Sequence, residues 1–162
     1  MNNLVKGKYY ITRPGGEKLH AELEELQAKR MQMAGNIRTA KAFGDLSENF
    51  EYHEAKREQG MVEGRIMQLK QILPQLEMVG PEEVDISTVG FGTVVRVLEN
   101  TVDEVCYSIV GPLEADPMDD RISYESPLGE ALWGRRLGET VTVQVPVGTI
   151  SLEIVEIRRY EI

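Results

Sequence analysis

Residues 19 to 76 contain two series of apolar residues with heptad spacing, and the two series mirror each other about one point in the chain. Steps of three and four residues alternate in each series, which is typical of coiled-coil helices. In an antiparallel alignment, every layer shares one mirror centre at residue 46. We therefore predict a helical hairpin with its turn at residues 44–48. The first series is Leu19, Leu23, Leu26, Arg30, Met33, Ile37 and Ala40, and the second is Tyr52, Ala55, Gln59, Val62, Ile66, Leu69 and Leu73.

The period of the apolar pattern changes after this hairpin. Residues 80–88 contain a proline and three acidic residues without a helical stripe, which is typical of a linker. Strand-like segments follow at 93–98, 104–110, 121–125, 140–145 and 149–157, with a short helix expected at 127–134. We predict an α+β chain with three parts. A coiled-coil hairpin domain spans 1–79, the linker spans 80–88, and a small antiparallel β domain with one short helix spans 89–162.

The boundaries of the two long helices can also be predicted. Thr12 can cap the first helix, which runs over residues 17–43. Asp45 or Ser47 can begin the second helix, which ends near Pro74. At a rise of 1.5 Å per residue, the turn stands roughly 40 Å from the base of the hairpin.

Charge and cysteine content exclude several classes of function. The acidity lies in residues 80–162, which carry 6 Lys and Arg against 16 Asp and Glu, whereas residues 1–79 carry 12 against 11, and the net charge is -9. An acidic chain gains little from counterion release, so a basic protein surface is a better partner than free DNA or RNA. Cys106 is the sole cysteine, which excludes an intrachain disulfide and a cysteine-rich zinc site. No apolar run reaches the roughly 20 residues that span a membrane. The first ten residues also lack the core of a secretory signal, so we expect a cytoplasmic protein with no membrane partner.

Two acidic residues stand at the predicted turn. Asp45 and Glu48 are spaced i and i+3, which at a helix start places both carboxylates on one side. Carboxylate oxygens suit Mg²⁺, but two of them provide only half of a site. The same spacing also fits an N-terminal capping box, and the two interpretations are compatible.

Basic residues flank this turn. Lys41 and Lys56 can share one flank of the hairpin and hold a phosphate backbone, although ordinary solvated helix charges give the same pattern. His20 and His53 are far apart in the hairpin and cannot form a two-histidine metal site. The sequence contains no Ser/His/Asp arrangement, phosphate loop or dinucleotide fingerprint.

Four segments of the chain carry a resemblance to a known family: Thr12 to Leu26, Gly44 to His53, Gly60 to Ile66 and Ile122 to Gly134. The most specific of them holds Gly-Asp-Leu-x-Glu-Asn at the turn. These segments resemble the Gre family of bacterial transcript cleavage factors, within which the GreA group matches best. The resemblance implies a coiled-coil hairpin, an FKBP-like C-terminal domain, and a monomer that docks at the secondary channel of RNA polymerase.

The resemblance also implies roles for single residues. The family's two tip acids fall on Asp45 and Glu48, which would help to place a second Mg²⁺ and a water in the polymerase active site, with no cofactor bound by the protein alone. Water then cleaves the 3′ end of backtracked nascent RNA, and elongation resumes. Lys41 and Lys56 correspond to basic residues that can contact the RNA end, although Lys replaces the usual Arg and loses bidentate contact with phosphate. At the position of Ser47, members of the family often have a basic residue. The polymerase-facing loop corresponds to Ser123, Glu125, Ser126 and Pro127.

Four functions therefore compete. The first is an accessory factor that stimulates RNA hydrolysis by the polymerase and is not itself an enzyme. The second is an inhibitor of the same channel, which the intact pair of tip acids argues against. The third is a prolyl isomerase or chaperone, whose pocket needs several aromatic walls. The fourth is a purely structural coiled coil, in which the tip acids would be exchangeable.

Overall fold

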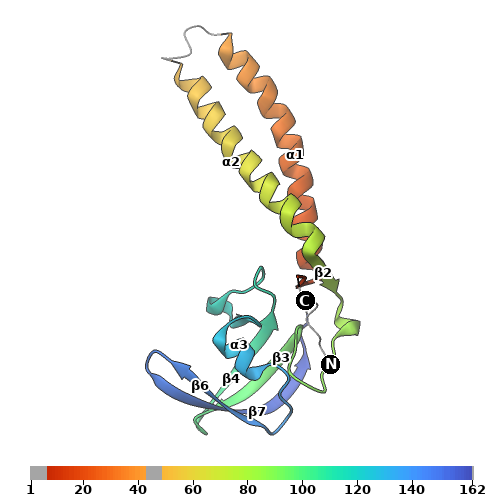
Figure 1. The fold of residues 1–162 in the computed structure, drawn as a ribbon, viewed down its shortest axis with the longest axis vertical. Coiled ribbons are helices and arrows are strands. Elements are labelled where there is room, and N and C mark those ends of the chain that lie inside the picture. The colour runs from red at the N-terminus through yellow and green to blue at the C-terminus, as the bar shows by residue number, and fades with distance from the viewer. Residues whose placement is uncertain (1–6, 43–48, 162) are drawn as a thin grey trace. The chain divides into compact units, whose positions relative to one another are not determined.

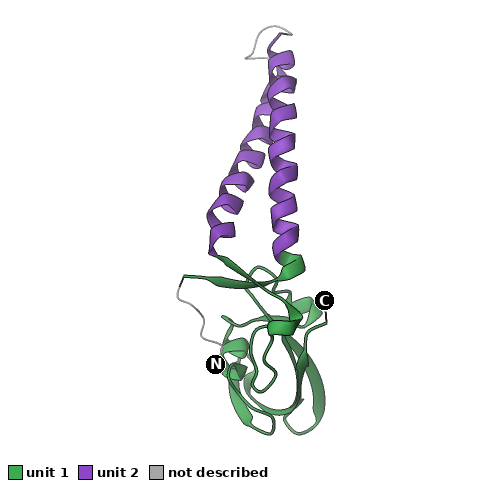
Figure 2. Cartoon of the chain, turned by 90° about the vertical axis from the view of Figure 1, so that its right-hand side faces the viewer, with its two compact units in different colours: residues 1–15, 76–162 green, residues 16–75 purple. Residues whose placement is uncertain are grey.

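The computed structural model describes residues 7–42 and 49–161, which form an α+β fold with a long helical hairpin and a curled β-sheet (Figure 1). The chain divides into two compact units (Figure 2). One comprises residues 16–75, and the other comprises residues 1–15 together with 76–162. These bounds differ from the predicted domains, because both ends of the predicted hairpin domain, 1–15 and 76–79, belong to the unit that contains the sheet. The predicted tip at 44–48 lies outside the described residues.

The hairpin unit consists of helices α1 (Arg13–Lys41) and α2 (Phe50–Ile72), followed by the 3₁₀ turn η1 (Leu73–Gln75). Every residue of the two predicted heptad series is buried or half-buried. Met33, Val62 and Ile66 form the buried centre, against which Leu23 and Leu26 pack. Because the apolar seam of each helix faces the other, the predicted antiparallel hairpin is confirmed.

Ion pairs between the helices fix the same register. Arg65 donates to Glu22 at 2.6 Å, and Lys29 lies 2.7 Å from Glu58. Arg30, the charged residue within the apolar seam, is paired with Glu63 at 3.6 Å. Glu22, the earliest of these α1 residues, pairs with Arg65, the latest of these α2 residues, as antiparallel packing requires.

The starts of the helices differ from prediction in one respect. The Thr12 hydroxyl accepts from Gly15 N at 3.2 Å, so the predicted cap of α1 is confirmed. The cap of α2 is Asn49, whose side chain accepts from Tyr52 N at 3.0 Å. The prediction that Asp45 or Ser47 begins this helix is therefore wrong. The helix begins at Phe50, and Asn49, directly before it, binds the free backbone amide of Tyr52 in its first turn.

A five-stranded sheet forms most of the other unit. Its strands are β3 (Thr93–Glu99), β4 (Asp103–Val110), β5 (Arg121–Ser123), β6 (Thr140–Val145) and β7 (Gly148–Arg159), in the order β5-β4-β3-β7-β6. All neighbours are antiparallel except β4 and β5, which run parallel. The predicted antiparallel sheet is therefore confirmed apart from this one edge. The connection from Val110 returns through η3 (Pro117–Asp119) to the level of Ser108, which lies opposite Arg121. β5 therefore runs parallel to β4. The predicted short helix is present as α3 (Pro127–Leu132).

A second, two-stranded sheet was not predicted. β1 (Tyr9–Thr12) pairs in parallel with β2 (Leu76–Val79), with Tyr9 opposite Leu76 and Thr12 opposite Val79. Neither segment alternates apolar and polar residues strictly, which is the pattern that identifies a half-buried strand. The 3₁₀ turn η2 (Pro81–Glu83) follows β2, inside the segment predicted as a linker.

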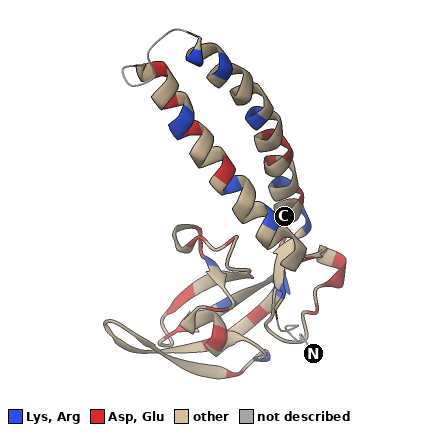
Figure 3. Cartoon of the chain, turned by 45° about the horizontal axis from the view of Figure 1, so that its top comes forward, with Lys and Arg blue, Asp and Glu red and all other residues tan. Residues whose placement is uncertain are grey.

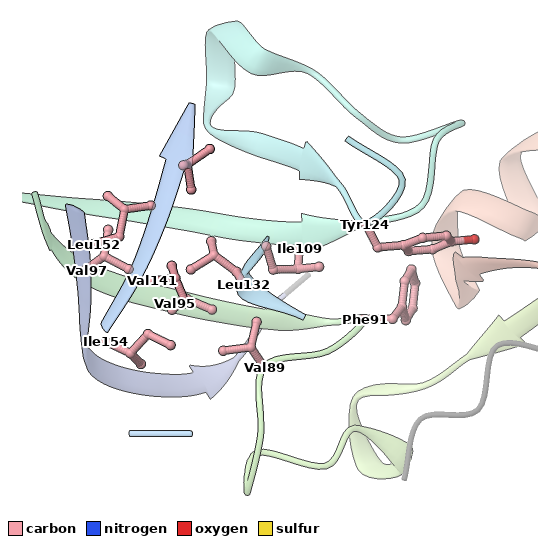
Figure 4. Close-up of a cluster of buried hydrophobic side chains, with 11 residues drawn as sticks. Val89, Phe91, Val95, Val97, Ile109, Tyr124, Leu132, Val141, Leu152 and Ile154 are labelled. Carbon is pink, nitrogen blue, oxygen red and sulfur yellow. The ribbon is translucent and has the colours of Figure 1, made fainter. Parts of the chain in front are cut away.

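The core of this unit lies between the curled sheet and α3, as Figure 4 shows. Leu132 of α3 and Val95, Leu152 and Ile154 of the sheet have no exposed surface. Two aromatic residues of this unit, Phe91 and Tyr124, are 5% and 4% exposed and belong to this packed core. Burial raises the pKa of the Tyr124 hydroxyl above its usual value. Within the described residues, no helix is both long and apolar enough to cross a membrane.

Candidate functional site

The structure describes the two helix ends that flank the predicted tip. Asp45 and Glu48, the predicted metal-binding acids, lie outside the described residues. On one side the described chain reaches the end of α1 at Lys41, and on the other it resumes at Asn49. The tip is thus a short segment between two long helices that pack along a common seam.

Asn49 connects these two helix ends. Its side-chain oxygen accepts from Tyr52 N at 3.0 Å, and its side-chain nitrogen donates to Ala40 O at 2.7 Å. One side chain therefore satisfies a free amide at the start of α2 and a free carbonyl near the end of α1. Sequence reasoning did not single out this residue. The preference of Asn for N-cap positions, together with its place directly before an apolar series, was the available signal.

The two predicted RNA-contacting lysines lie on different helices near this end. Lys41 is the last residue of α1, and Lys56 is in the second turn of α2. Both are exposed, and Lys56 donates to Gln59 at 3.3 Å, a bond within its own helix. In Figure 3, blue Lys and Arg residues lie at the end of α1. The two ammonium groups are accessible, and the structure gives no contact that joins them.

The donor set at the tip fits part of a magnesium site. Asp45 and Glu48 offer carboxylate oxygens, the ligands that Mg²⁺ prefers, but two side chains leave most of an octahedral shell to other donors. Among the described residues there is no group of three or more His, Cys, Asp or Glu side chains that could hold a metal ion.

The predicted docking loop forms a hydrogen-bonded turn between β5 and α3. Ser126 caps α3 by accepting from Gly129 N at 3.1 Å, and it donates to Ser123 O at 2.7 Å. The Ser123 hydroxyl accepts from Glu125 N at 3.1 Å. The two serines are half-buried within the turn, whereas Glu125 and Pro127 are exposed. Of the four predicted docking residues, these last two present their side chains to solvent.

Comparison with known proteins gives matches to both parts of the chain. A family model described as "Transcription elongation factor, N-terminal" matches residues 9–78, and one described as "Transcription elongation factor, GreA/GreB, C-term" matches residues 82–159. The chain is 49% identical over 151 residues to transcription elongation factor GreA of Caldanaerobacter subterraneus subsp. tengcongensis, covering 92% of this chain and 96% of that protein. It is 47% identical to GreA of Thermoanaerobacter pseudethanolicus, with the same coverage. Among solved structures, it is similar to GreA factor homolog 1 of Thermus thermophilus at 25% identity, covering 93% of this chain and 99% of that one, with a TM-score of 0.44.

Proposed function

The chain belongs to the GreA/GreB family of transcription elongation factors, close to GreA, and we propose that it binds RNA polymerase and stimulates cleavage of the 3′ end of backtracked nascent RNA. In this proposal the polymerase performs the hydrolysis, and the protein is an accessory factor rather than an enzyme. It acts as a monomer in the cytoplasm, where it delivers its tip through the secondary channel.

The observation that supports this proposal best is the construction of the hairpin. α1 has 29 residues and α2 has 23, which correspond to about 43 Å and 34 Å at 1.5 Å per residue. Residues 44–48, which carry both acids, connect the far ends of these helices. A buried seam and cross-helix ion pairs hold the two helices together, and both acids belong to the short sequence that joins them.

The tip residues would then have separate tasks. The carboxylates of Asp45 and Glu48 supply part of a ligand set that the polymerase completes. When bound there, Mg²⁺ supplies the Lewis-acid chemistry that activates water and stabilises the leaving oxygen. Lys41 and Lys56 neutralise phosphates of the RNA end as point charges. Asn49 limits the separation of the helix ends between which the acids lie.

Docking would involve the other unit. That unit carries 9 Lys and Arg against 17 Asp and Glu, whereas residues 16–75 carry 9 against 10. Its acidity favours a basic surface on the partner. We assign the docking contact to the turn between β5 and α3, with exposed Glu125 and Pro127 as the contacting side chains and Ser123 and Ser126 as the groups that shape the turn.

A cleavage assay tests the tip mechanism. Stalled, backtracked elongation complexes with labelled RNA are incubated with Mg²⁺ and either the natural chain or the Asp45→Asn/Glu48→Gln variant. We expect the variant to stimulate cleavage at least roughly 10-fold less, the range reported when groups around a catalytic metal are removed. The matched control is Glu24→Gln/Glu25→Gln, which removes the same charge from exposed positions of α1.

The outcomes separate the competing functions. Equal cleavage with the tip variant would refute the tip mechanism and leave a structural coiled coil. A natural chain that binds the polymerase and slows elongation without cleavage would be the channel inhibitor. Accelerated isomerisation of a proline peptide would support the isomerase.

A further inference from the structure

One exposed aromatic side chain lies beside the segment that joins the two long helices. Phe50, the first residue of α2, is 78% exposed. Every other Phe, Tyr and Trp side chain in the described part of the chain is buried or half-buried. Apolar surface stabilises a fold only where it is removed from water. Phe50 therefore adds little to the core of either unit, and its large ring is available to a partner.

The backbone around Phe50 is held by hydrogen bonds on both sides. Asn49, directly before it, donates to Ala40 O of α1 at 2.7 Å, and the same side chain accepts from Tyr52 N at 3.0 Å. Tyr52 is itself half-buried in the seam between the helices. The exposed ring of Phe50 is thus attached to a fixed backbone, which reduces the ordering entropy that a contact with a partner would cost.

Phe50 shares one face of α2 with two other side chains that can stack on flat rings. His53 and Arg57 follow it at i+3 and i+7, the spacing that places side chains on the same side of a helix. Both are exposed. Single-stranded RNA bases stack on aromatic rings, on imidazole and on the guanidinium plane of arginine. We call Phe50, His53 and Arg57 the stacking face.

Within the stacking face, Phe50 is the member without a partner among the described residues. The His53 ring contacts the Tyr52 ring edge-on, with 5.6 Å between the ring centroids. Arg57 donates to Glu54 at 2.9 Å, which offsets its charge. No other aromatic ring of the described chain contacts Phe50. Phe50 is therefore the side chain of this face that is most open to a base.

The lysines near the stacking face indicate the class of the partner. Lys41 and Lys56 are exposed, and the Lys56 ammonium donates to the neutral side chain of Gln59. Neither lysine forms an ion pair with another described residue. Exposed aromatic rings together with cations that track phosphates are the combination by which proteins bind single-stranded nucleic acid.

The proposed function, on which this inference rests, brings an unpaired RNA 3′ end to this end of the hairpin. We propose that Phe50 stacks on a base of the extruded 3′ end of nascent RNA and so helps to hold that end during cleavage. Stacking requires only the flat face that every base has. The contact is therefore expected with any of the four bases.

A cleavage assay with ring-preserving and ring-removing variants tests this contact. Backtracked elongation complexes are assembled with RNA whose 3′ end is unpaired with the template, and stimulation over the rate without the protein is measured below saturation. Phe50→Leu keeps an apolar side chain without the ring and should stimulate cleavage roughly 5-fold less, the lower end of the range for base stacking. Phe50→Tyr keeps the ring and should stay within about 2-fold of the natural chain.

The matched control removes an exposed apolar side chain elsewhere on the same helix. Met67 is 63% exposed and lies about 25 Å from Phe50 along α2 at 1.5 Å per residue. Met67→Ala should stimulate cleavage as strongly as the natural chain.

A matching change in the RNA isolates the contact from other effects. An abasic nucleotide at the extruded end removes the base and keeps the phosphate. It should lower stimulation by the natural chain roughly 5-fold and leave stimulation by Phe50→Leu unchanged, because two changes to one contact are not additive.

A fluorescence measurement detects the same contact without cleavage. The extruded base is replaced with 2-aminopurine, whose emission falls when it stacks, and the chain carries Asp45→Asn/Glu48→Gln so that the RNA stays intact. Emission should fall with this chain and remain unchanged when Phe50→Leu is added.

The outcomes separate this inference from the proposed function. Equal stimulation by Phe50→Leu and the natural chain would overturn the stacking contact and leave the cleavage function standing. A loss with Phe50→Leu that is the same on abasic and natural RNA would also overturn it, since Phe50 would then contact an apolar surface of the polymerase. A natural chain that stimulates no cleavage would instead refute the proposed function, and the stacking contact with it.

Discussion

At the scale of single residues, the side chain of Asn49 makes two hydrogen bonds that involve different helices. It accepts from Tyr52 N and donates to Ala40 O, so it caps α2 and closes the turn towards α1. Serine can cap a helix almost as well as asparagine, but its hydroxyl is too short to span to the other helix. The two functions of Asn49 can therefore be separated by substitution.

We expect Asn49→Ala to lower the free energy of unfolding by about 1 kcal/mol or more, because the cap and the cross-helix bond are both lost. Asn49→Ser should retain most of that stability while losing the bond to Ala40, and it should stimulate RNA cleavage less than the natural chain. Urea unfolding and the cleavage assay measure the two effects. Asn36→Ser, an exposed change within α1, is the control. Full cleavage by Asn49→Ser would show that the bridging bond does not position the tip.

The ion pair of Glu22 and Arg65 predicts a pH dependence. The hydrogen bond from Arg65, followed by the attraction of that charge, lowers the pKa of Glu22 below its usual value. A carboxyl group with a lowered pKa in the folded state stabilises the fold above its unfolded pKa, and this contribution disappears as the pH falls through the folded pKa. Because both side chains are more than a third exposed, the contribution at pH 7 is small, about 0.5 kcal/mol.

Glu22→Gln should therefore be less stable than the natural chain at pH 7, and this difference should shrink as the pH is lowered below about 4, the usual range of a glutamate pKa. Urea unfolding followed by helical circular dichroism measures the difference at each pH. Glu24→Gln, on the same helix and without an ion pair among the described residues, should show little difference at either pH. A stability difference that is independent of pH for Glu22→Gln would contradict the assignment.

At the scale of elements, a helix or strand could be predicted when its apolar pattern extended over many residues. The hairpin could be predicted because fourteen seam positions over two helices constrain one register, and all of them are buried or half-buried. β1 and β2 could not be predicted, since neither alternates apolar and polar residues strictly and the two are distant in sequence. The strand at β5 was predicted, but a strand pattern does not show whether its pairing with β4 is parallel or antiparallel. The bridging role of Asn49 escaped for a similar reason, because the cross-helix bond depends on the relative placement of two helix ends.

Two glycines of α1 differ in the space that surrounds them. At Gly15 an added methyl group would collide with the carboxylate of Glu114, which accepts from Thr12 N at 2.9 Å and from the Thr12 hydroxyl. At Gly35, in the exposed middle of the helix, it would meet nothing within 4 Å. The first glycine allows the close approach of the Glu114 carboxylate, and the second only lowers helix propensity.

We therefore expect Gly35→Ala to stabilise the fold by about 0.5–1 kcal/mol, which is the difference in helix propensity. Gly15→Ala should destabilise it by about 1–3 kcal/mol, because the carboxylate must move away from Thr12 or the helix start must shift. Each variant serves as the control for the other, since both make the same chemical change in one helix. Urea unfolding measures the sign of the change in the free energy of unfolding. Stabilisation by Gly15→Ala would show that the fold does not need the Glu114 carboxylate beside Thr12.

At the scale of the whole molecule, each compact unit has its own apolar core. Met33, Val62 and Ile66 form the centre of the hairpin unit, and the larger cluster between the sheet and α3 includes Leu152. The distribution of charge follows the same division, with the acidity concentrated in the unit that contains the sheet. This division of charge was visible in the sequence, whereas the membership of residues 1–15 and 76–79 in the sheet-containing unit depends on β1 and β2, which sequence patterns could not reveal.

Separate cores predict separate local unfolding, which hydrogen exchange of the full chain can measure. Ile66 is 2% exposed and Leu152 is fully buried, and replacing either with alanine removes buried methyl groups at a cost of about 2–5 kcal/mol. Ile66→Ala should accelerate exchange in α1 and α2 and leave β3 and β7 protected. Leu152→Ala should do the reverse, since its cavity opens in the sheet. Met67→Ala, next to Ile66 but on the exposed face of α2 at 63% exposure, should alter neither unit. If each core variant accelerates exchange equally in both units, the two units unfold as one cooperative structure and the division into separately stabilised parts is wrong.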